Sequence, residues 1–287
     1  MGSATQPQSC SRPRPATRVE IRGQGLSRSF NGRPVLCGLD LEILTTDMVA
    51  IVGESGCGKT VLLDLLTGLL EPDSGRVFVA DHSRPDAPLV ELGRLDQDGL
   101  DRIRLNWSVV FQRNALFGGT VYDNVALWLI EHTDLSEHEI RRRVRVSLER
   151  AALDPDDVWS KDRHELSGGM AKRVAIARAI ATDPAVIFYD EPTTGLDPVV
   201  GSQIHELIRE IHAVPRADGL PRTSVIITHD QELLCRLRPR IILLADGTIC
   251  FDGTYEQFRV AKGSCAARYL RAMDALQTRP PPNPDDG

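Results

Sequence analysis

A glycine-rich segment, Gly53–Thr60, places the strongest constraint on how this chain can fold. It reads Gly-Glu-Ser-Gly-Cys-Gly-Lys-Thr and matches the pattern G-x-x-x-x-G-K-[ST]. Before it, Met48–Val52 is a continuous apolar run, typical of a strand buried on both faces. After it, an apolar helix is predicted from Lys59 to Leu70. A strand, a glycine-rich turn and a helix in this order predict a phosphate-binding loop.

The residue types in this loop suit a nucleotide. The glycines let successive backbone N–H groups face phosphate oxygens, and the helix N-terminus adds partial positive charge. Lys59 supplies a charge for the β- and γ-phosphates, and the Thr60 hydroxyl is a ligand for Mg²⁺. We expect every residue of the loop to contact the nucleotide: Gly53, Glu54, Ser55, Gly56, Cys57, Gly58, Lys59 and Thr60. A chance glycine-rich turn would not explain the strand and helix in register around it.

A second apolar run ends in two acids. Val186-Ile-Phe-Tyr-Asp190 has the pattern of a buried strand, and Glu191 follows directly. Beside a phosphate-binding loop, Asp190 is predicted to hold the Mg²⁺ shell. Because successive side chains at a strand end point different ways, Glu191 can face the attacking water as a general base. Taken alone, the segment could also be two surface acids that close a strand.

Other parts of the chain predict the architecture around this site. Residues 19–43 alternate apolar and polar side chains and are broken by Asn31-Gly32, which predicts antiparallel strands joined by a turn. Later apolar runs alternate with helical stretches, which predicts an α/β fold with a parallel-sheet core. The runs are Ala185–Tyr189, Ser224–Ile227 and Ile241–Leu244, and the helical stretches are Val199–Val214 and Gln231–Leu237.

Residues 121–152 break this alternation, because they have the pattern of two helices with no strand between them. Ser136 and Glu139 have the spacing of a capping box for the second helix. Ile140, Val144 and Leu148 recur every fourth position and are predicted to be its buried face. The arginines between them are predicted to be solvated, with contact to lipid headgroups or a partner as the alternative: Arg141, Arg142, Arg143 and Arg145.

The segment Leu166–Met170 reads Leu-Ser-Gly-Gly-Met and opens a helix that continues through Arg178. Ser167 is the predicted N-cap, and Gly168 and Gly169 leave the first N–H groups of the helix exposed, which creates a second anion site. One γ-phosphate does not need two such sites from a single chain. We therefore expect two copies of the chain to enclose each nucleotide between them.

With these motifs in order, residues 19–254 resemble the nucleotide-binding domain of an ABC transporter. The resemblance implies that Ser167, Gly168 and Gly169 bind the ATP held by the opposing subunit. It implies that Phe30 stacks on adenine and that Gln112 reaches Mg²⁺ and senses a transmembrane permease. It also implies that Asp197 lies at the dimer interface and that His229 contacts the γ-phosphate.

A narrower resemblance is to the ATPase subunits of Mla-type, MCE-associated phospholipid transporters. It rests on Met170 in the signature, on Phe111–Phe117 and Thr120–Val125, and on Tyr189–Pro198. It implies a second copy of the chain, a transmembrane permease, an MCE-domain protein and a STAS-domain protein as partners. The Q-loop (Gln112–Phe117) would contact the permease. Arg113-Asn114 departs from the smaller residues of relatives, so the permease contact is expected to differ.

We divide the chain into three parts. Residues 1–18 are predicted to be a disordered tail, without the apolar region of a secretory signal and, because of Gln6, without a myristoylation pattern. Residues 19–253 form the ATP-binding domain, with a helical subdomain over about 113–180. Residues 254–287 form a helical extension, in which Thr254 caps a short helix, residues 266–276 form another, and Pro280–Pro282 belong to a disordered end.

Composition excludes some classes of protein. The net charge is -6 and the pI about 5.7, so the chain has no general basic field for nucleic acid. No apolar run reaches the roughly 20 residues of a membrane-spanning helix. The cysteines lack C-x-x-C pairs and metal-ligand spacing, so we expect isolated thiols in a reducing compartment, the cytosol. They are Cys10, Cys37, Cys57, Cys235, Cys250 and Cys265. The resemblance to transporter ATPases implies that the permease holds the chain at the cytoplasmic face of the inner membrane.

The sequence thus predicts an ATPase that uses ATP and Mg²⁺ to power phospholipid transport. One alternative is the ATPase of an importer for amino acids or another small solute. Another is a non-transport ABC ATPase that acts on DNA or ribosomes, which the single cassette and acidic balance disfavour. A phosphate-transferring kinase would not explain the Leu-Ser-Gly-Gly segment.

Overall fold

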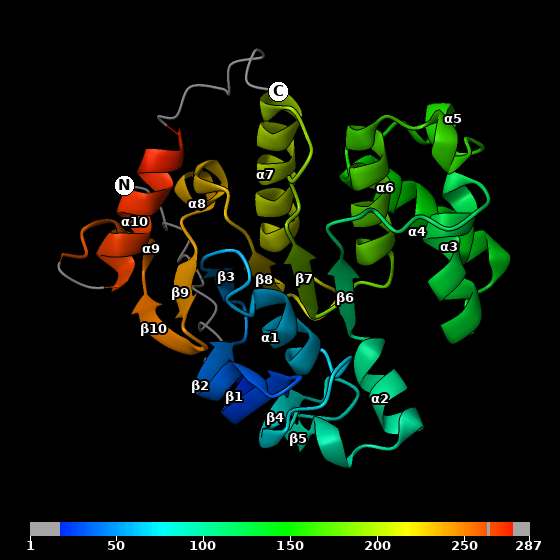
Figure 1. The fold of residues 1–287 in the computed structure, drawn as a ribbon. Helices are drawn as coiled ribbons and strands as arrows, with labels where there is room; N and C mark the ends of the chain where they lie inside the picture. The colour runs from blue at the N-terminus through cyan, green and yellow to red at the C-terminus, as the bar shows by residue number, and fades with distance from the viewer. Residues whose placement is uncertain (1–17, 263–264, 278–287) are drawn as a thin grey trace, which may run out of the picture.

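The computed structural model describes residues 18–262 and 265–277. Nearly all of the tail predicted over residues 1–18, and the proline-rich end at Pro280–Pro282, lie outside the described residues. The described chain forms two sheets, with helices on both faces of the larger one and a further helical group at its side (Figure 1).

An antiparallel sheet begins the described chain and confirms the predicted pair of strands. Its strands are β1 (Val19–Phe30), β2 (Arg33–Leu44), β4 (Ser74–Ala80) and β5 (Leu89–Glu91), in the order β2-β1-β4-β5. Phe30 pairs with Arg33 around the Asn31-Gly32 turn. Asn31 and Gly32 have φ angles of 51° and 75°, which suits the two-residue turn that matches the twist of a hairpin.

A larger sheet carries the site and confirms the predicted parallel core. Its strands are β3 (Met48–Val52), β6 (Trp107–Val110), β7 (Val186–Asp190), β8 (Thr223–Ile227), β9 (Arg240–Ala245) and β10 (Thr248–Gly253). The order is β10-β9-β3-β8-β7-β6, and all neighbours are parallel except the antiparallel pair of β9 and β10. The carboxyl ends of β3 and β7 therefore meet at one edge of the sheet.

Helix α1 (Lys59–Leu66) lies between the two sheets and shares one apolar core with both. It ends at Leu66 rather than at the predicted Leu70. The apolar composition continues to Leu70, but Gly68 has a left-handed φ of 67°, which the chain uses to leave the helix.

The other face of the larger sheet is covered by a second helical layer. Its helices are α6 (Gly168–Ala181), α7 (Pro198–Ala213), α8 (Gln231–Leu237), α9 (Tyr255–Arg259) and α10 (Cys265–Gln277). Thr254 caps α9 in a capping box, and α10 covers the stretch predicted to be a second helix of the extension. In Figure 1, α10 and α9 lie together at the β10 side of the sheet.

The predicted pair of helices is also confirmed, within a group at the β6 side of the sheet (Figure 1). The group contains α3 (Val121–His132), α4 (Glu137–Arg150) and α5 (Pro155–Val158), which pack against α6 around a third core. Ser136 and Glu139 form the predicted capping box, and Arg141, Arg142 and Arg145 are exposed. The shorter connecting elements are η1 (Leu92–Arg94), α2 (Gln97–Arg104) and η2 (Arg163–Glu165).

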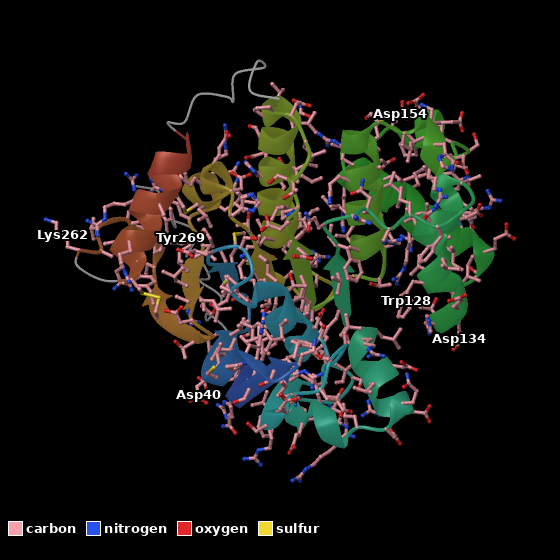
Figure 2. All side chains as sticks on the ribbon, in the orientation of Figure 1. Asp40, Trp128, Asp134, Asp154, Lys262 and Tyr269 are labelled. Carbon is pink, nitrogen blue, oxygen red and sulfur yellow. A yellow bond between two sulfur atoms is a disulfide. The ribbon has the colours of Figure 1, made fainter. Side chains whose placement is uncertain are left out.

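The expectation that all cysteines are isolated is wrong, because Cys250 and Cys265 form a disulfide (Figure 2). Cys250 lies on β10 and Cys265 begins α10, and the fold packs these elements together. Cysteines 15 residues apart show no pairing pattern in a sequence, so only the fold reveals the bond. Among the described residues, Cys37, Cys57 and Cys235 are free. The prediction of a reducing compartment rested on isolated thiols, so the Cys250–Cys265 disulfide weakens it.

Over residues 18–262 and 265–277, no helix combines the length and the apolar character that crossing a membrane requires.

Candidate nucleotide-binding site

A cavity of about 1010 Å³ lies at the carboxyl edge of the larger sheet. Residues that are distant from one another in the sequence meet in this cavity. Predicted site residues in its lining are Gly53, Glu54, Ser55, Gly56, Gly58, Lys59, Thr60, Gln112, Asp190, Glu191 and His229. The walls thus come from the loop after β3, the end of β7 and the turn after β8. Such a position, beyond the ends of parallel strands, is where α/β sheets bind ligands.

The loop between β3 and α1 has the geometry of a phosphate cradle. Gly58 has a φ of 104°, a conformation that favours glycine. At Gly53, a Cβ atom would lie 2.4 Å from the Leu244 carbonyl oxygen, so the loop leaves no room for a side chain there. Lys59 Nζ donates to the carbonyl oxygens of Gly53 (2.9 Å) and Glu54 (3.0 Å). The ammonium group is therefore held over the loop, on the cavity side.

Cys57 differs from its neighbours in the loop. Its side chain packs against the apolar core and is not among the described residues that line the cavity. Burial raises the pKa of the Cys57 thiol, although Lys59 opposes this effect. The predicted contact of Cys57 with a nucleotide is thus restricted to its backbone.

Two carboxylates meet at the end of β7. Asp190 is 9% exposed, and burial together with the charges of Glu191 and Asp64 raises its pKa, against the effect of Lys172 and Lys59. Glu191 has a left-handed φ of 45°, a conformation that costs energy for a residue with a Cβ and that clusters at functional sites. Its Oε1 atom lies 2.8 Å from His229 Nδ1. The backbone thus turns Glu191 away from the strand and toward His229.

Asp230, which follows His229, anchors this turn, although no motif in the sequence indicated it. Asp230 Oδ2 lies 2.9 Å from His205 Nε2 and accepts from Thr193 Oγ1 at 2.7 Å. Burial acts to raise the pKa of Asp230, but hydrogen bonds from His205, Thr193 and the Leu233 N–H hold it well below its ordinary value. The buried His205 could have been noticed as a polar residue on the apolar face of α7.

The signature segment lies apart from the cavity. Ser167 is the N-cap of α6, as predicted, and its Oγ accepts from the Met170 N–H at 3.2 Å. None of the predicted signature and interface residues is among the described residues in the lining: Ser167, Gly168, Gly169 and Asp197. Gly169 instead faces Val200 of the same chain, and Asp197 caps α7 through the N–H groups of Val199 and Val200. The helix N-terminus that was predicted to be a second anion site is therefore present, but its residues lie outside the described lining of this cavity.

Phe30 is also outside the lining that the described residues form. Its side chain is 41% exposed, and the Arg28 guanidinium lies 5.0 Å from the ring centroid. Val35, on the adjoining strand, lines the cavity instead. Stacking of Phe30 on adenine stays a prediction.

Helix α10 forms a wall of the cavity, which no motif in the sequence predicted. Tyr269, Ala272 and Met273 line it, and Figure 2 shows Tyr269 on the side of α10 that faces the sheet. Tyr269 is 7% exposed, and burial raises its pKa to about 12, with the Gly53 backbone acting against the rise. The sequence over residues 265–277 has only an amphipathic helical pattern, so its position depends on long-range packing.

Comparison with known proteins agrees with this geometry. The ABC transporter family matches residues 36–194. The chain is 35% identical to the intermembrane phospholipid transport system ATP-binding protein MlaF of Haemophilus influenzae, over 88% of this chain and 90% of that one. It is 37% identical to the sulfate/thiosulfate import ATP-binding protein CysA of Methylococcus capsulatus, over 80% of this chain and 61% of that one.

A solved structure is similar as well. It is an ATP-binding cassette in a dimeric post-hydrolysis state with ADP and Pi, with a TM-score of 0.69 and 30% identity over 82% of this chain and 98% of that one. The fold, the cavity and the relatives thus lead to one assignment. The chain belongs to the ABC transporter family, as an ATP-binding subunit that hydrolyses ATP.

Proposed function

We propose that two copies of this chain enclose ATP between the loop of one and the signature segment of the other, and that the closure powers phospholipid transport. The observation that carries the first part is the position of the signature. Ser167, Gly168 and Gly169 present a helix N-terminus with exposed N–H groups, yet they do not belong to the described lining of their own cavity. A second copy supplies the missing partner.

In this proposal, the residues of the cavity divide the chemistry of hydrolysis. The loop N–H groups and Lys59 hold the phosphates. Glu191 accepts the proton of the attacking water, and His229, 2.8 Å away, orients the carboxylate and contacts the γ-phosphate. Gln112 lines the same cavity as Asp190, and its side chain would reach Mg²⁺ there.

The lining also suits Mg²⁺, which the Thr60 hydroxyl, Asp190 and Gln112 would hold. Among the described residues, no cluster of three or more His, Cys, Asp or Glu side chains forms a metal cage. Mg²⁺ does not require one, because it is commonly bound by one or two carboxylates together with substrate phosphates and water. A cation would also offset the burial that raises the pKa of Asp190. When bound, Mg²⁺ neutralises charge on the phosphates.

The lipid cargo rests on similarity to the phospholipid transport protein, which extends over 90% of that relative. With such a cargo, the partners are a transmembrane permease, an MCE-domain protein and a STAS-domain protein. The permease would hold the chain at the cytoplasmic face of the inner membrane. The exposed side chains of Phe111, just before the Q-loop, and of Phe117, at its end, offer apolar contact to that permease.

A substitution of the general base tests the enzymatic part of this proposal. Glu191→Gln keeps the shape of the side chain and removes the base, so we expect turnover to fall on the order of a hundredfold or more. ATP binding should persist, and the variant should accumulate as an ATP-bound dimer in size-exclusion chromatography with light scattering. Glu137→Gln, on an exposed acid that pairs with Arg141, serves as the control. Normal turnover by Glu191→Gln would exclude the assigned base.

A second candidate keeps the ATPase and changes the cargo to a small solute. The 37% identity to a sulfate and thiosulfate import protein favours it. Affinity purification of the tagged chain from its native membranes in mild detergent separates the two. Co-purification of a permease with an MCE-domain protein supports lipid transport. A solute permease with a soluble binding protein would contradict the lipid cargo and leave the ATPase assignment intact.

A further inference from the structure

A buried lysine on the signature helix holds the backbone of the Q-loop. Lys172 of α6 is 1% exposed. Its Nζ donates to the carbonyl oxygens of Phe111 (3.0 Å) and Gln112 (2.9 Å). Among the described residues, the one lysine in an ion pair is Lys161, so Lys172 has no carboxylate partner, although the charge of Asp190 acts on it. The buried ammonium group is therefore satisfied chiefly by the backbone of one loop.

Other cations hold the rest of the same segment. Arg178, also on α6, donates to the carbonyl oxygens of Ala115 (3.0 Å) and Asn114 (3.4 Å). Arg163 donates to the carbonyl oxygen of Leu116 at 3.2 Å. Residues 111–117 have no helix or strand, so their carbonyl groups lack the partners that regular structure provides. These cations supply the partners from the helical side of the molecule.

Lys172 differs from the two arginines in where it acts. Arg178 and Arg163 hold the outer part of the Q-loop, whereas Lys172 holds the peptide of Gln112 itself, a residue that lines the nucleotide cavity. At 1% exposure, Lys172 lies where a charge is unfavourable, because burial removes the ammonium group from water. A buried charge is weak support for stability, so a role in placing a neighbour explains this lysine better.

We propose that Lys172 is a positioning residue for ATP hydrolysis, which fixes the Gln112 backbone and thereby sets the Gln112 side chain in the cavity. The inference rests on the proposed function, because it acts through the role of Gln112 at the phosphates. Lys172 lies one turn into the helix that begins with the signature residues. The signature of one nucleotide site and the Gln112 of the other are therefore attached to the same helix.

A double-mutant cycle in the full-length chain tests this inference. Lys172→Met keeps the length of the side chain and removes the donors, and we expect kcat to fall on the order of tenfold or more. KM for Mg²⁺-ATP should change little, because the loop and Lys59 still hold the phosphates. Gln112→Ala should lower kcat as well. In the double variant, the two losses should not multiply, because removing Gln112 leaves Lys172 nothing to position.

The neighbouring arginine provides the control. Arg173 lies on the same helix and donates to the Ala151 carbonyl and to Gln203, with no hydrogen bond to the Q-loop in the described chain. Arg173→Met should lower thermal stability, and its effect on kcat should multiply with that of Gln112→Ala. If Lys172→Met fails to fold, Lys172→Gln replaces it in the cycle, because the shorter, neutral side chain keeps a polar group but does not reach both carbonyl oxygens as Nζ does.

The outcomes separate this inference from the proposed function. If kcat of the Lys172→Met and Gln112→Ala double variant falls by the product of the two single decreases, the positioning role of Lys172 is wrong. The role of Gln112 then remains intact. An unchanged kcat in Gln112→Ala overturns the assigned role of Gln112 and, with it, this inference. Losses that do not multiply, with KM unchanged, support the positioning role.

Discussion

The nucleotide cavity has two walls of different origin. The loop at Gly53–Thr60 takes its shape from local rules, since its glycines, the preceding strand and the following helix lie within a short stretch of chain. Helix α10 reaches the same cavity from the far end of the sequence, through packing on β10 and the Cys250–Cys265 bond. The loop contains the charge and the N–H groups that a phosphate needs, whereas α10 contributes Tyr269, Ala272 and Met273, none of which carries a positive charge. We infer that the loop binds the nucleotide, whereas α10 shapes the cavity around it.

The largest expected effect tests the loop. Lys59→Met removes the ammonium group that lies over the loop carbonyls and keeps the side-chain length. Because charge-assisted contacts to phosphate are strong, we expect ATP affinity and turnover to fall on the order of a hundredfold or more. Isothermal titration calorimetry with ATP and a coupled phosphate-release assay measure the two quantities.

The matched change at an unrelated lysine is Lys161→Met, which breaks only an exposed pair with Asp157. It should leave ATP binding and turnover as they are. If Lys59→Met keeps its ATP affinity, the loop is not the main phosphate contact. The loop and α10 would then differ less in their contribution to ATP binding than we infer.

The loop at Gly53–Thr60 was predictable because its signals are local, and the same holds for other turns and caps of the fold. Asn31-Gly32 predicted the hairpin, Ser136 and Glu139 the cap of α4, and Ser167 the cap of α6. Each prediction depends on residues a few positions apart, whose backbone geometry the side chains set directly. Only the predicted end of α1 was wrong. The apolar run continues to Leu70, but the left-handed conformation of Gly68 ends the helix earlier.

The remaining features depend on contacts between distant segments. Lys172 contacts Phe111 and Gln112 across sequence separations of 61 and 60 residues, and Asp230 meets His205 across 25. Local patterns fix which face of an element is buried, but they do not identify the groups that it meets. For the same reason no pattern in the sequence identified Val35 as a residue that lines the cavity.

A smaller effect is expected from cutting the link that holds α10. In the chain-entropy treatment, a bond that closes a loop of about 15 residues stabilises by about 3 kcal/mol, and the Cys250–Cys265 separation is 15. We expect Cys265→Ser to increase local opening of α10, since an element at the periphery of a fold can open independently of its core. Hydrogen exchange over residues 265–277 should therefore become faster.

The control for this substitution is Cys37→Ser, a free and exposed cysteine among the described residues. It should leave exchange over α10 unchanged, as should Cys265→Ser over the loop at Gly53–Thr60. Faster exchange throughout the cavity in Cys265→Ser would show that the two walls are one cooperative unit, contrary to the comparison.

The smallest effect is expected where the two walls meet. Tyr269→Phe removes only the hydroxyl of a buried ring beside the Gly53 backbone. Loss of a single buried hydrogen-bonding group lowers the free energy of unfolding by about 1 kcal/mol, so chemical denaturation should detect a modest loss. Because α10 shapes the cavity without holding phosphate, ATP affinity should change far less than in Lys59→Met. A loss of affinity as large as that of Lys59→Met would instead make Tyr269 a binding residue, and the division between a chemical wall and a shaping wall would fail.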